Sequence, residues 1–444
     1  MLFRSGVALG AAARAWALLA VPLGLYLLGT RGQLEFLNAS SLHTFYRARL
    51  TRAYLGAGNR ARFKGPDGQP PRHAHDELPE EPADGQRVLR QVDEVHGGDE
   101  VPMTAYAPHR HGGPVHLMGC CINQTRDPRG GLYNRDRRGL PLTVGPQQQV
   151  RVGLGPWQAS AEQGAADLQL GQWMAISGAA FSPGLGSATR GGLSVLATLA
   201  GVRLGYWWNS ARPTPAVSKP EGLLAELTGR FCGTERRQWF LSDGGHAENT
   251  GAYALLAERC QLVLLADCGA DPEYRFEDLE NLMRRARIDL KVHFEALQPR
   301  EVDGQAPDAR WRHFGTLEQL RQPNSTRCLA LFRLHYPDQR PGLLVLVKPS
   351  LWDAMPVDLL NYHAQNPSFP QQSTMDQFFD EAQWESYHLL GRELGALLPG
   401  AALEGLVDAP DTHFVRAEGG SPDPAPAVTG PRGGSLMEIG RAHV

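Results

Sequence analysis

The stretch Trp239–Pro272 reads WFLSDGGHAENTGAYALLAERCQLVLLADCGADP. It begins with the short apolar segment Trp239–Ser242, which ends at Asp243 and the two glycines Gly244 and Gly245. Because glycine adopts backbone conformations that other residues avoid, this pattern predicts a strand followed by a tight turn. An aspartate at the end of a strand occupies a position suited to a catalytic carboxylate. The same Asp-Gly pair is common in structural turns and helix caps, so the pattern alone leaves both roles open.

The segments that follow alternate between helical and strand-like patterns. They are the helical segment Thr250–Arg259, the apolar run Gln261–Ala266, the helical segment Phe276–Arg287 and the apolar run Val292–Leu297. With the first apolar segment, this order of strand, helix, strand, helix, strand predicts a parallel sheet with right-handed crossovers, hence an α/β fold. Such sheets bind ligands beyond the carboxyl ends of their strands, which is where Asp243 is expected.

The composition argues against several classes of function. A formal net charge of −3 over 444 residues provides no basic field for nucleic acid, and neither Walker nor zinc-finger spacing occurs. Six cysteines occur without a C-x-x-C pair, at positions 120, 121, 232, 260, 268 and 328. This spacing predicts reduced, largely buried thiols and therefore a cytoplasmic location for the globular part.

One group of histidines is a candidate metal site. His109, His111 and His116 lie close together in the sequence. Because no cysteine or carboxylate cluster accompanies them, a solvated loop is the favoured interpretation. We therefore expect neither a cofactor nor a resident metal.

The N-terminal segment Gly6–Gly29 is apolar except for Arg14. Its 24 residues match the ~20 that a helix needs to cross a bilayer. The segment therefore predicts a membrane helix, with an amphipathic or buried helix as the alternative. Arginines follow it at positions 31, 47, 49 and 52. Under the positive-inside rule, they predict that the globular part faces the cytoplasm, and the arginine-rich, lysine-poor composition suggests a bacterial membrane.

Changes in composition divide the rest of the chain. We expect a membrane-associated segment over residues 1–35, a linker or flexible insertion over 36–100, an α/β domain over 101–398 and a disordered tail over 399–444. The last seven residues, Glu438–Val444 (EIGRAHV), read like a translated sequencing adapter and are expected not to belong to the native protein. The same reasoning is compatible with a truncated 5′ end, and it leaves open whether Met1 is the true start.

Several motifs resemble the patatin-like phospholipases, and most closely a bacterial, membrane-embedded subgroup of that family. The segment SDGG at Ser242–Gly245 looks like the family's D-G-[GA] motif, and AISGAAFSPG at Ala175–Gly184 is similar to the small-residue segment that precedes it. DGGHAENTGAYALLAERC and the stretch Asn366–Gly391, NPSFPQQSTMDQFFDEAQWESYHLLG, look like signatures of the subgroup. The resemblance covers roughly residues 115–395.

This resemblance implies a parallel-sheet α/β hydrolase with a Ser-Asp dyad, in which Asp243 of the motif Asp243-Gly244-Gly245 is the base. The family's serine lies upstream in a G-x-S-x-G elbow, a motif that this sequence does not contain. The chain therefore resembles the C-terminal half of such an enzyme. Ser177, in A-I-S-G-A, is an alternative nucleophile, because a strained elbow requires small neighbours.

The expected function is hydrolysis of acyl esters, such as phospholipids or lysophospholipids, by an intact protein of which this chain carries the aspartate but not the serine. We expect the chain alone to be inactive, with membrane lipid or another acyl ester as its partner and no nucleic acid. The alternative is a non-catalytic, membrane-tethered domain that binds lipid or a partner.

Four further polar residues have open roles. Glu248 and Asn249 either orient Asp243 or, as we favour, cap the helical segment after Thr250. Asp267 and Asp271 have the same ambiguity as Asp243, and the Pro272 that follows favours Asp271 as the lead into the next helix.

Overall fold

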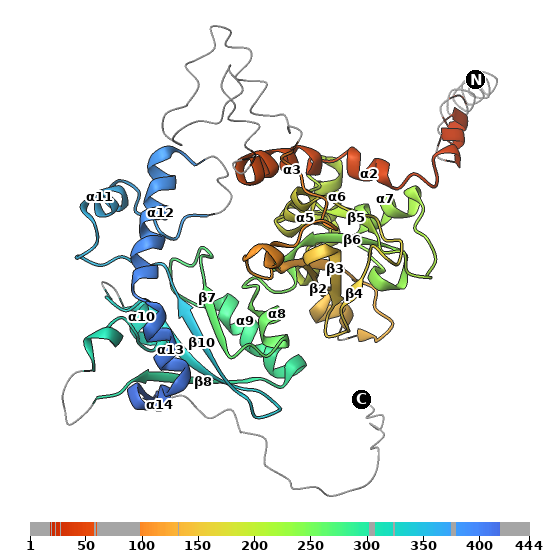
Figure 1. Ribbon diagram of the computed structural model, residues 1–444. Coiled ribbons are helices and arrows are strands. Elements are labelled where there is room, and N and C mark those ends of the chain that lie inside the picture. The colour runs from red at the N-terminus through yellow and green to blue at the C-terminus, as the bar shows by residue number, and fades with distance from the viewer. Residues whose placement is uncertain are drawn as a thin grey trace, which may run out of the picture. The chain divides into compact units, whose positions relative to one another are not determined.

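The computed structural model describes residues 18–417, except positions 19, 23, 27, 57, 58, 60–97, 132, 302–306, 323–324 and 374–378. The chain divides into two compact units, Met1–Ala254 and Leu255–Val444. Figure 1 labels many of the helices and strands of both units, and the short helix α8 (Ala252–Ala257) contains the point of division.

The first unit contains a six-stranded sheet in which all neighbouring strands are antiparallel. In sheet order the strands are β4 (Gln158–Ala159), β3 (Gln149–Val152), β2 (Gly139–Gly145), β1 (Met118–Asn123), β6 (Gln238–Asp243) and β5 (Tyr206–Asn209). Its helices and short helical turns are α2 (Glu35–Ala39), α3 (His43–Leu50), η1 (Thr51–Leu55), η4 (Pro108–His111), η5 (Tyr133–Arg137), η6 (Pro146–Gln148), α5 (Leu170–Ser177), η7 (Gly186–Ala188), α6 (Gly191–Leu199), α7 (Lys219–Thr228), η8 (Gly233–Glu235) and η9 (Gly244–His246).

Both faces of this sheet are covered by aromatic side chains. Because successive residues of a strand point to opposite faces, the neighbours Trp207 and Trp208 of β5 belong to different cores. Trp208 packs edge-on against Trp173 of α5 and against Trp239, with ring centroids 5.4 Å apart in each pair. On the other face, Trp207 packs edge-on against Phe240 at 5.2 Å.

The second unit contains a five-stranded mixed sheet. In sheet order its strands are β11 (Phe414–Arg416), β8 (His293–Pro299), β9 (Leu329–His335), β10 (Pro341–Val347) and β7 (Leu262–Ala266). Only the β10–β7 pair is parallel among these described strands. The helices and helical turns are α9 (Glu277–Arg285), η10 (Ala286–Leu290), η11 (Ala309–Trp311), α10 (Leu317–Arg321), α11 (Val357–Gln365), α12 (Glu381–Ala396), α13 (Gly400–Asp408) and α14 (Pro410–His413).

The core of the second unit lies where the sheet meets α11, α12 and α13. Leu331 and Val345 of the central strands are buried against residues such as Leu359, Leu390 and Leu406 from those helices. Helix α12 begins where its N-cap residue Asp380 accepts a hydrogen bond from the backbone N–H of Gln383 at 2.7 Å. Such a cap satisfies a donor that the first turn of a helix leaves without a partner.

The predicted parallel-sheet hydrolase core is wrong, although every element predicted in Trp239–Leu297 exists. Strand β6 belongs to the antiparallel sheet of the first unit, whereas β7 and β8 belong to the mixed sheet of the second. Within that sheet, the β9–β10 hairpin separates β7 from β8. Strand β7 is an edge strand with Val263 buried and Leu264 48% exposed, so its apolar run does not mark a strand covered on both faces.

The predicted N-terminal membrane helix also needs correction. No helix among the described residues is both long enough and apolar enough to cross a membrane. Most of the predicted span Gly6–Gly29, including all of residues 6–17, lies outside the described residues.

The expected domain boundaries differ from the structure at both ends. The predicted linker, 36–100, contains α3 and η1, and its residues 60–97 lie outside the described part. The predicted tail contains α13, α14 and β11, and its residue Phe414 is fully buried. Folded structure therefore continues beyond Pro399. The adapter-like Glu438–Val444 lies outside the described residues.

Candidate functional site

Asp243 is the last residue of β6, as the sequence predicts. Its strand is held between β1 and β5, and Asp243 itself lies opposite Cys120 of β1. One carboxylate oxygen, Oδ1, accepts a hydrogen bond from the backbone N–H of Gly245 at 2.7 Å. The carboxylate therefore also caps the helical turn η9, as the structural interpretation of the Asp-Gly pair predicts.

The environment of Asp243 favours its protonated form. Burial raises the pKa of the Asp243 carboxyl above its ordinary value, and the hydrogen bond from Gly245 opposes this shift only in part. Among the described residues, no side chain donates a hydrogen bond to this carboxylate. A half-buried carboxylate with a raised pKa and unused acceptor capacity has the properties required of a general base.

Close packing against the backbone of β1 requires Gly244, whereas at Gly245 the nearest atom belongs to the Asn249 side chain. A Cβ atom on Gly244 would lie 2.6 Å from the carbonyl oxygen of Gly119 in β1, well inside contact distance. A Cβ atom on Gly245 would collide with the side-chain oxygen of Asn249. Steric contacts therefore explain why small residues follow Asp243, whether or not Asp243 is catalytic.

Ser177 lies near this strand end. It is the last residue of α5, and its hydroxyl donates a hydrogen bond to the carbonyl of Gly119 at 2.7 Å. Two residues later, the carbonyl of Ala179 accepts a hydrogen bond from the backbone N–H of Asp243 at 3.4 Å. The fold thus brings the Ser177 and Asp243 segments to one end of β1. No hydrogen bond joins their two side chains in the described part of the chain, so Ser177 lacks the contact that would activate it.

The structure adds Tyr46 of α3 to the neighbourhood of Asp243. The pKa of the Tyr46 phenol is raised by burial and, to a smaller extent, by the negative charge of Asp243. A Cβ atom on Gly178 would lie 2.7 Å from the Tyr46 hydroxyl, which places this phenol beside the end of α5. Nearly 200 residues separate Tyr46 from Asp243 in the sequence, so no local pattern signals their proximity.

A buried polar network supports the turn from the other face of β6. The Asn123 amide donates to the hydroxyl of Ser242 at 2.8 Å, and that hydroxyl is 2.8 Å from Nδ1 of His246. Burial lowers the pKa of His246 to about 4, so the ring is neutral near pH 7. Because Ser242 is fully buried, this Ser-His contact fixes the turn and does not present a nucleophile.

The predicted capping role of Glu248 is confirmed. Its carboxylate accepts hydrogen bonds from the backbone N–H groups of Thr250 at 2.7 Å and Tyr253 at 3.3 Å, at the start of α8. Asn249 packs against Gly245 of the turn. Neither side chain donates a hydrogen bond to the carboxylate of Asp243.

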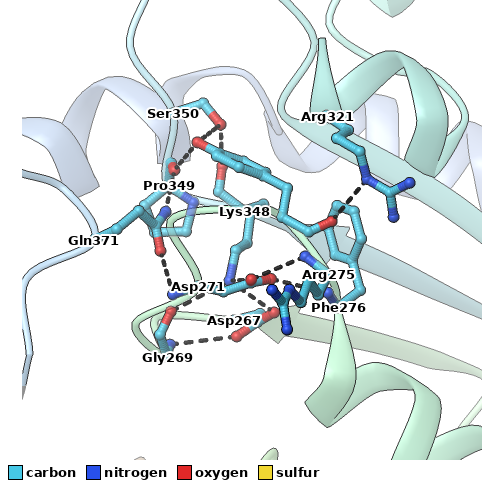
Figure 2. Close-up of polar contacts among 11 residues, drawn as sticks. Asp267, Gly269, Asp271, Arg275, Phe276, Arg321, Lys348, Pro349, Ser350 and Gln371 are labelled. Carbon is cyan, nitrogen blue, oxygen red and sulfur yellow. Dashed lines mark hydrogen bonds and ion pairs between the residues drawn. The ribbon is translucent and has the colours of Figure 1, made fainter. Parts of the chain in front are cut away.

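Asp267 and Asp271 belong to a separate cluster in the second unit, around the fully buried Lys348. Figure 2 shows the Lys348 ammonium directed at both carboxylates, at 3.1 Å from Asp267 and 3.8 Å from Asp271. Asp271 also accepts hydrogen bonds from the backbone N–H groups of Arg275 and Phe276, which confirms its predicted role as the lead into α9. Asp267 and Lys348 directly follow β7 and β10, so the only parallel strand pair of the described sheets brings them together.

The histidine group does not form a metal site in the described structure. His109 and His111 lie in η4, whereas His116 is 3.0 Å from the Tyr106 hydroxyl. Within the described ranges, no group of three or more His, Cys, Asp or Glu side chains is arranged to hold a metal ion. None of the six cysteines, all of which lie in the described part of the chain, forms a disulfide, and Cys120, Cys121 and Cys328 are buried.

Comparisons with known proteins do not add to this geometry. No protein-family model, curated protein or solved structure matches the chain. The resemblance to patatin-like phospholipases therefore stays a prediction.

Proposed function

We propose that this chain carries the general base of an acyl-ester hydrolase, and that Asp243 is that base. The main support for this proposal is the environment of the Asp243 carboxylate. This group lies at a strand end, burial raises its pKa, and one backbone N–H is its only hydrogen-bond donor among the described residues. If this carboxylate served only to cap the turn, a raised pKa would bring no benefit to the fold.

The reaction follows from the chemistry of a Ser-Asp pair. A serine hydroxyl attacks the acyl carbonyl while the carboxylate accepts its proton, and the alcohol leaves with a proton returned by the same carboxyl. Water then repeats the sequence and releases the fatty acid. The proposed substrate class is an acyl ester such as a phospholipid. The serine is proposed to come from a G-x-S-x-G segment outside this sequence.

The test uses two forms of the protein and an alkyl fluorophosphonate, which labels activated serines. The 444-residue chain should neither label nor hydrolyse p-nitrophenyl butyrate. A longer gene product with an upstream G-x-S-x-G segment should do both. In that protein, Asp243→Asn should lower kcat by about a thousandfold or more, because the members of such a unit act together.

Asp136→Asn is the matched control, because Asp136 is an exposed carboxylate of the same unit that pairs with Arg135. Its activity should equal that of the wild type. Full activity of Asp243→Asn in the longer protein would refute the proposal. Labelling of Ser177 in the 444-residue chain would refute the external serine and make Ser177 the nucleophile.

A further inference from the structure

The first unit contains a cavity of about 370 Å³ on the face of β6 opposite Asp243. Its floor is aromatic and consists of the buried side chains of Trp207, Phe231 and Phe240. One face of α7 forms its wall, since residues 221, 224, 225 and 228 line it with the i, i+3, i+4, i+7 spacing of a single helix face. On this wall, Leu224 is 60% exposed and adds an apolar rim.

Three arginines line the same cavity, namely Arg126, Arg230 and Arg236. None of their guanidinium groups has a hydrogen-bond or ion-pair partner among the described residues. The cavity contains one carboxylate, Glu221, and this group is occupied by the capping box of α7, where it accepts hydrogen bonds from the backbone N–H and hydroxyl of Ser218. The lining therefore has an excess of positive charge, with three arginines against one carboxylate, and only Arg236 among the three interacts electrostatically with Glu221.

We propose that this cavity binds an amphipathic anion, with its apolar chain on the aromatic floor and its anionic headgroup at the arginines. A site of this volume holds roughly a dozen water molecules, and hence a ligand with roughly a dozen non-hydrogen atoms. A medium-chain carboxylate or alkyl phosphate has this size and polarity. Guanidinium groups bind both headgroups through paired N–H donors.

The charge of the lining distinguishes this ligand class from the alternatives. A neutral apolar ligand would leave three arginines unpaired, and a cation would be repelled by them. Nucleic acid is a poor fit, because the chain has a net charge of −3 and the floor is apolar. This inference does not depend on Asp243, which lies on the other face of the strand.

Cys232 gives a direct measure of occupancy, because it lines the cavity and is partly exposed. In the full chain, decanoate below its micellar concentration should slow alkylation of Cys232 by N-ethylmaleimide, as followed by peptide mass spectrometry. Decyl phosphate should do the same if the arginines accept a phosphate headgroup, and the tighter of the two identifies the preferred headgroup. Decyltrimethylammonium should have no effect. Cys268, an exposed thiol of the second unit, is the internal control, and its alkylation rate should stay constant.

Calorimetric titration with decanoate then tests the arginines. The double variant Arg126→Gln/Arg230→Gln should weaken binding by about tenfold or more, because it removes two charged donors. Both side chains are exposed, so the variant is expected to fold. Arg237→Gln, next to Arg236 but outside the cavity, should bind like the wild type, as should Asp243→Asn.

Three results would overturn the proposal. They are the absence of protection of Cys232 by both anions, equal protection by the cation, and unchanged decanoate affinity in the double variant. If the double variant does not fold, the single variant Arg126→Gln decides the last comparison. Absence of esterase activity from the longer protein, with decanoate binding intact, would count only against the proposed function, since the two sites share no residue.

Discussion

At the scale of single residues, Asp243 caps a turn and is also the proposed general base. Its Oδ1 atom caps the turn η9 by accepting a hydrogen bond from the backbone N–H of Gly245. Burial makes the ionised form of its carboxyl less stable than it is in water and so raises its pKa. Groups that serve chemistry are commonly less than optimal for stability, because their environment is set by the reaction.

Asp243→Asn should stabilise the protein at pH 7 by an amount on the order of 1 kcal/mol. Burial raises the pKa of Asp243 in the folded state, so the folded protein holds this proton more tightly than the unfolded chain does. The unfolding free energy of the wild type therefore falls as pH rises from the ordinary carboxyl pKa of about 3.9 through the raised pKa. Urea titrations from pH 4 to 8 should show the advantage of the variant shrinking toward pH 4.

Asp127→Asn is a control that should change the unfolding free energy at pH 7 in the opposite direction to Asp243→Asn. Asp127 is buried, and the hydrogen bond from the Arg129 side chain is the largest cause of its lowered pKa. This variant should lose about 1–3 kcal/mol at pH 7, and the loss should diminish as the pH falls below about 4. If Asp127→Asn and Asp243→Asn change stability in the same direction at pH 7, the assigned environment of Asp243 is incorrect.

Gly244→Ala should lower the unfolding free energy by about 2 kcal/mol or more, because the added methyl would overlap the Gly119 carbonyl in the middle of the sheet. Denaturant unfolding measures the change. Gly192→Ala in α6 is the matched substitution, since its Cβ atom would meet open space. That variant should be neutral or more stable by up to about 1 kcal/mol, because alanine favours the helix. Equal effects of the two substitutions would contradict the close approach of η9 and β1.

At the scale of elements, the parallel pair β7–β10 ends in a buried ion pair. The side chain of Lys348 has no exposed surface, and Asp267 is also buried. Two buried charges stabilise a fold only weakly compared with apolar groups, but each is strongly destabilising without the other. The cluster therefore fixes how the segments after these two strands are arranged (Figure 2).

Lys348→Met should cost about 3–5 kcal/mol of unfolding free energy, because it leaves Asp267 buried without its cation. The double variant Lys348→Met/Asp267→Asn should recover part of this loss, and a double-mutant cycle from urea unfolding measures the coupling. The exposed pair Arg321–Glu318 is the control, and its cycle should give less than about 1 kcal/mol. Strictly additive single changes at Lys348 and Asp267 would contradict the pair.

At the scale of the whole molecule, the two units have separate hydrophobic cores. The main clusters of the first unit are built around Trp208 and Phe240, and that of the second around Phe314 and Phe414. None of these clusters contains residues from both units among the described positions. Each of the two described sheets also consists only of strands from its own unit. Stability is therefore expected to be largely local to each unit.

Phe414→Ala should destabilise the second unit by about 3–5 kcal/mol, because it removes a fully buried ring that packs against Trp311 and Phe314. Hydrogen exchange should accelerate in β8, β9 and β10, while amides of β1 and β6 keep their rates. Val415→Ala, on the neighbouring and less buried position of β11, should change exchange little. Equal acceleration in both sheets would show that the units unfold as one.

The sequence alone determined the local features of this protein. The strand that ends at Asp243, the glycine turn, the cap of Glu248 and the lead into α9 from Asp271 depend on residues within a few positions of one another. Periodicity and capping chemistry report such short-range preferences. The same reasoning failed at Gly400–Arg416, where a composition rich in small residues conceals the buried Leu406 and Phe414.

Only the tertiary structure decided which elements meet. An apolar strand face does not specify its partner, so the run at β7 fits an interior parallel strand and an edge strand equally well. The separation of β6 from β7 into different sheets, and the β9–β10 hairpin between β7 and β8, depend on contacts between distant segments. For the same reason, the approach of Tyr46 and Ser177 to Asp243, and the arginine-lined cavity on the opposite face, appear only when the chain is folded.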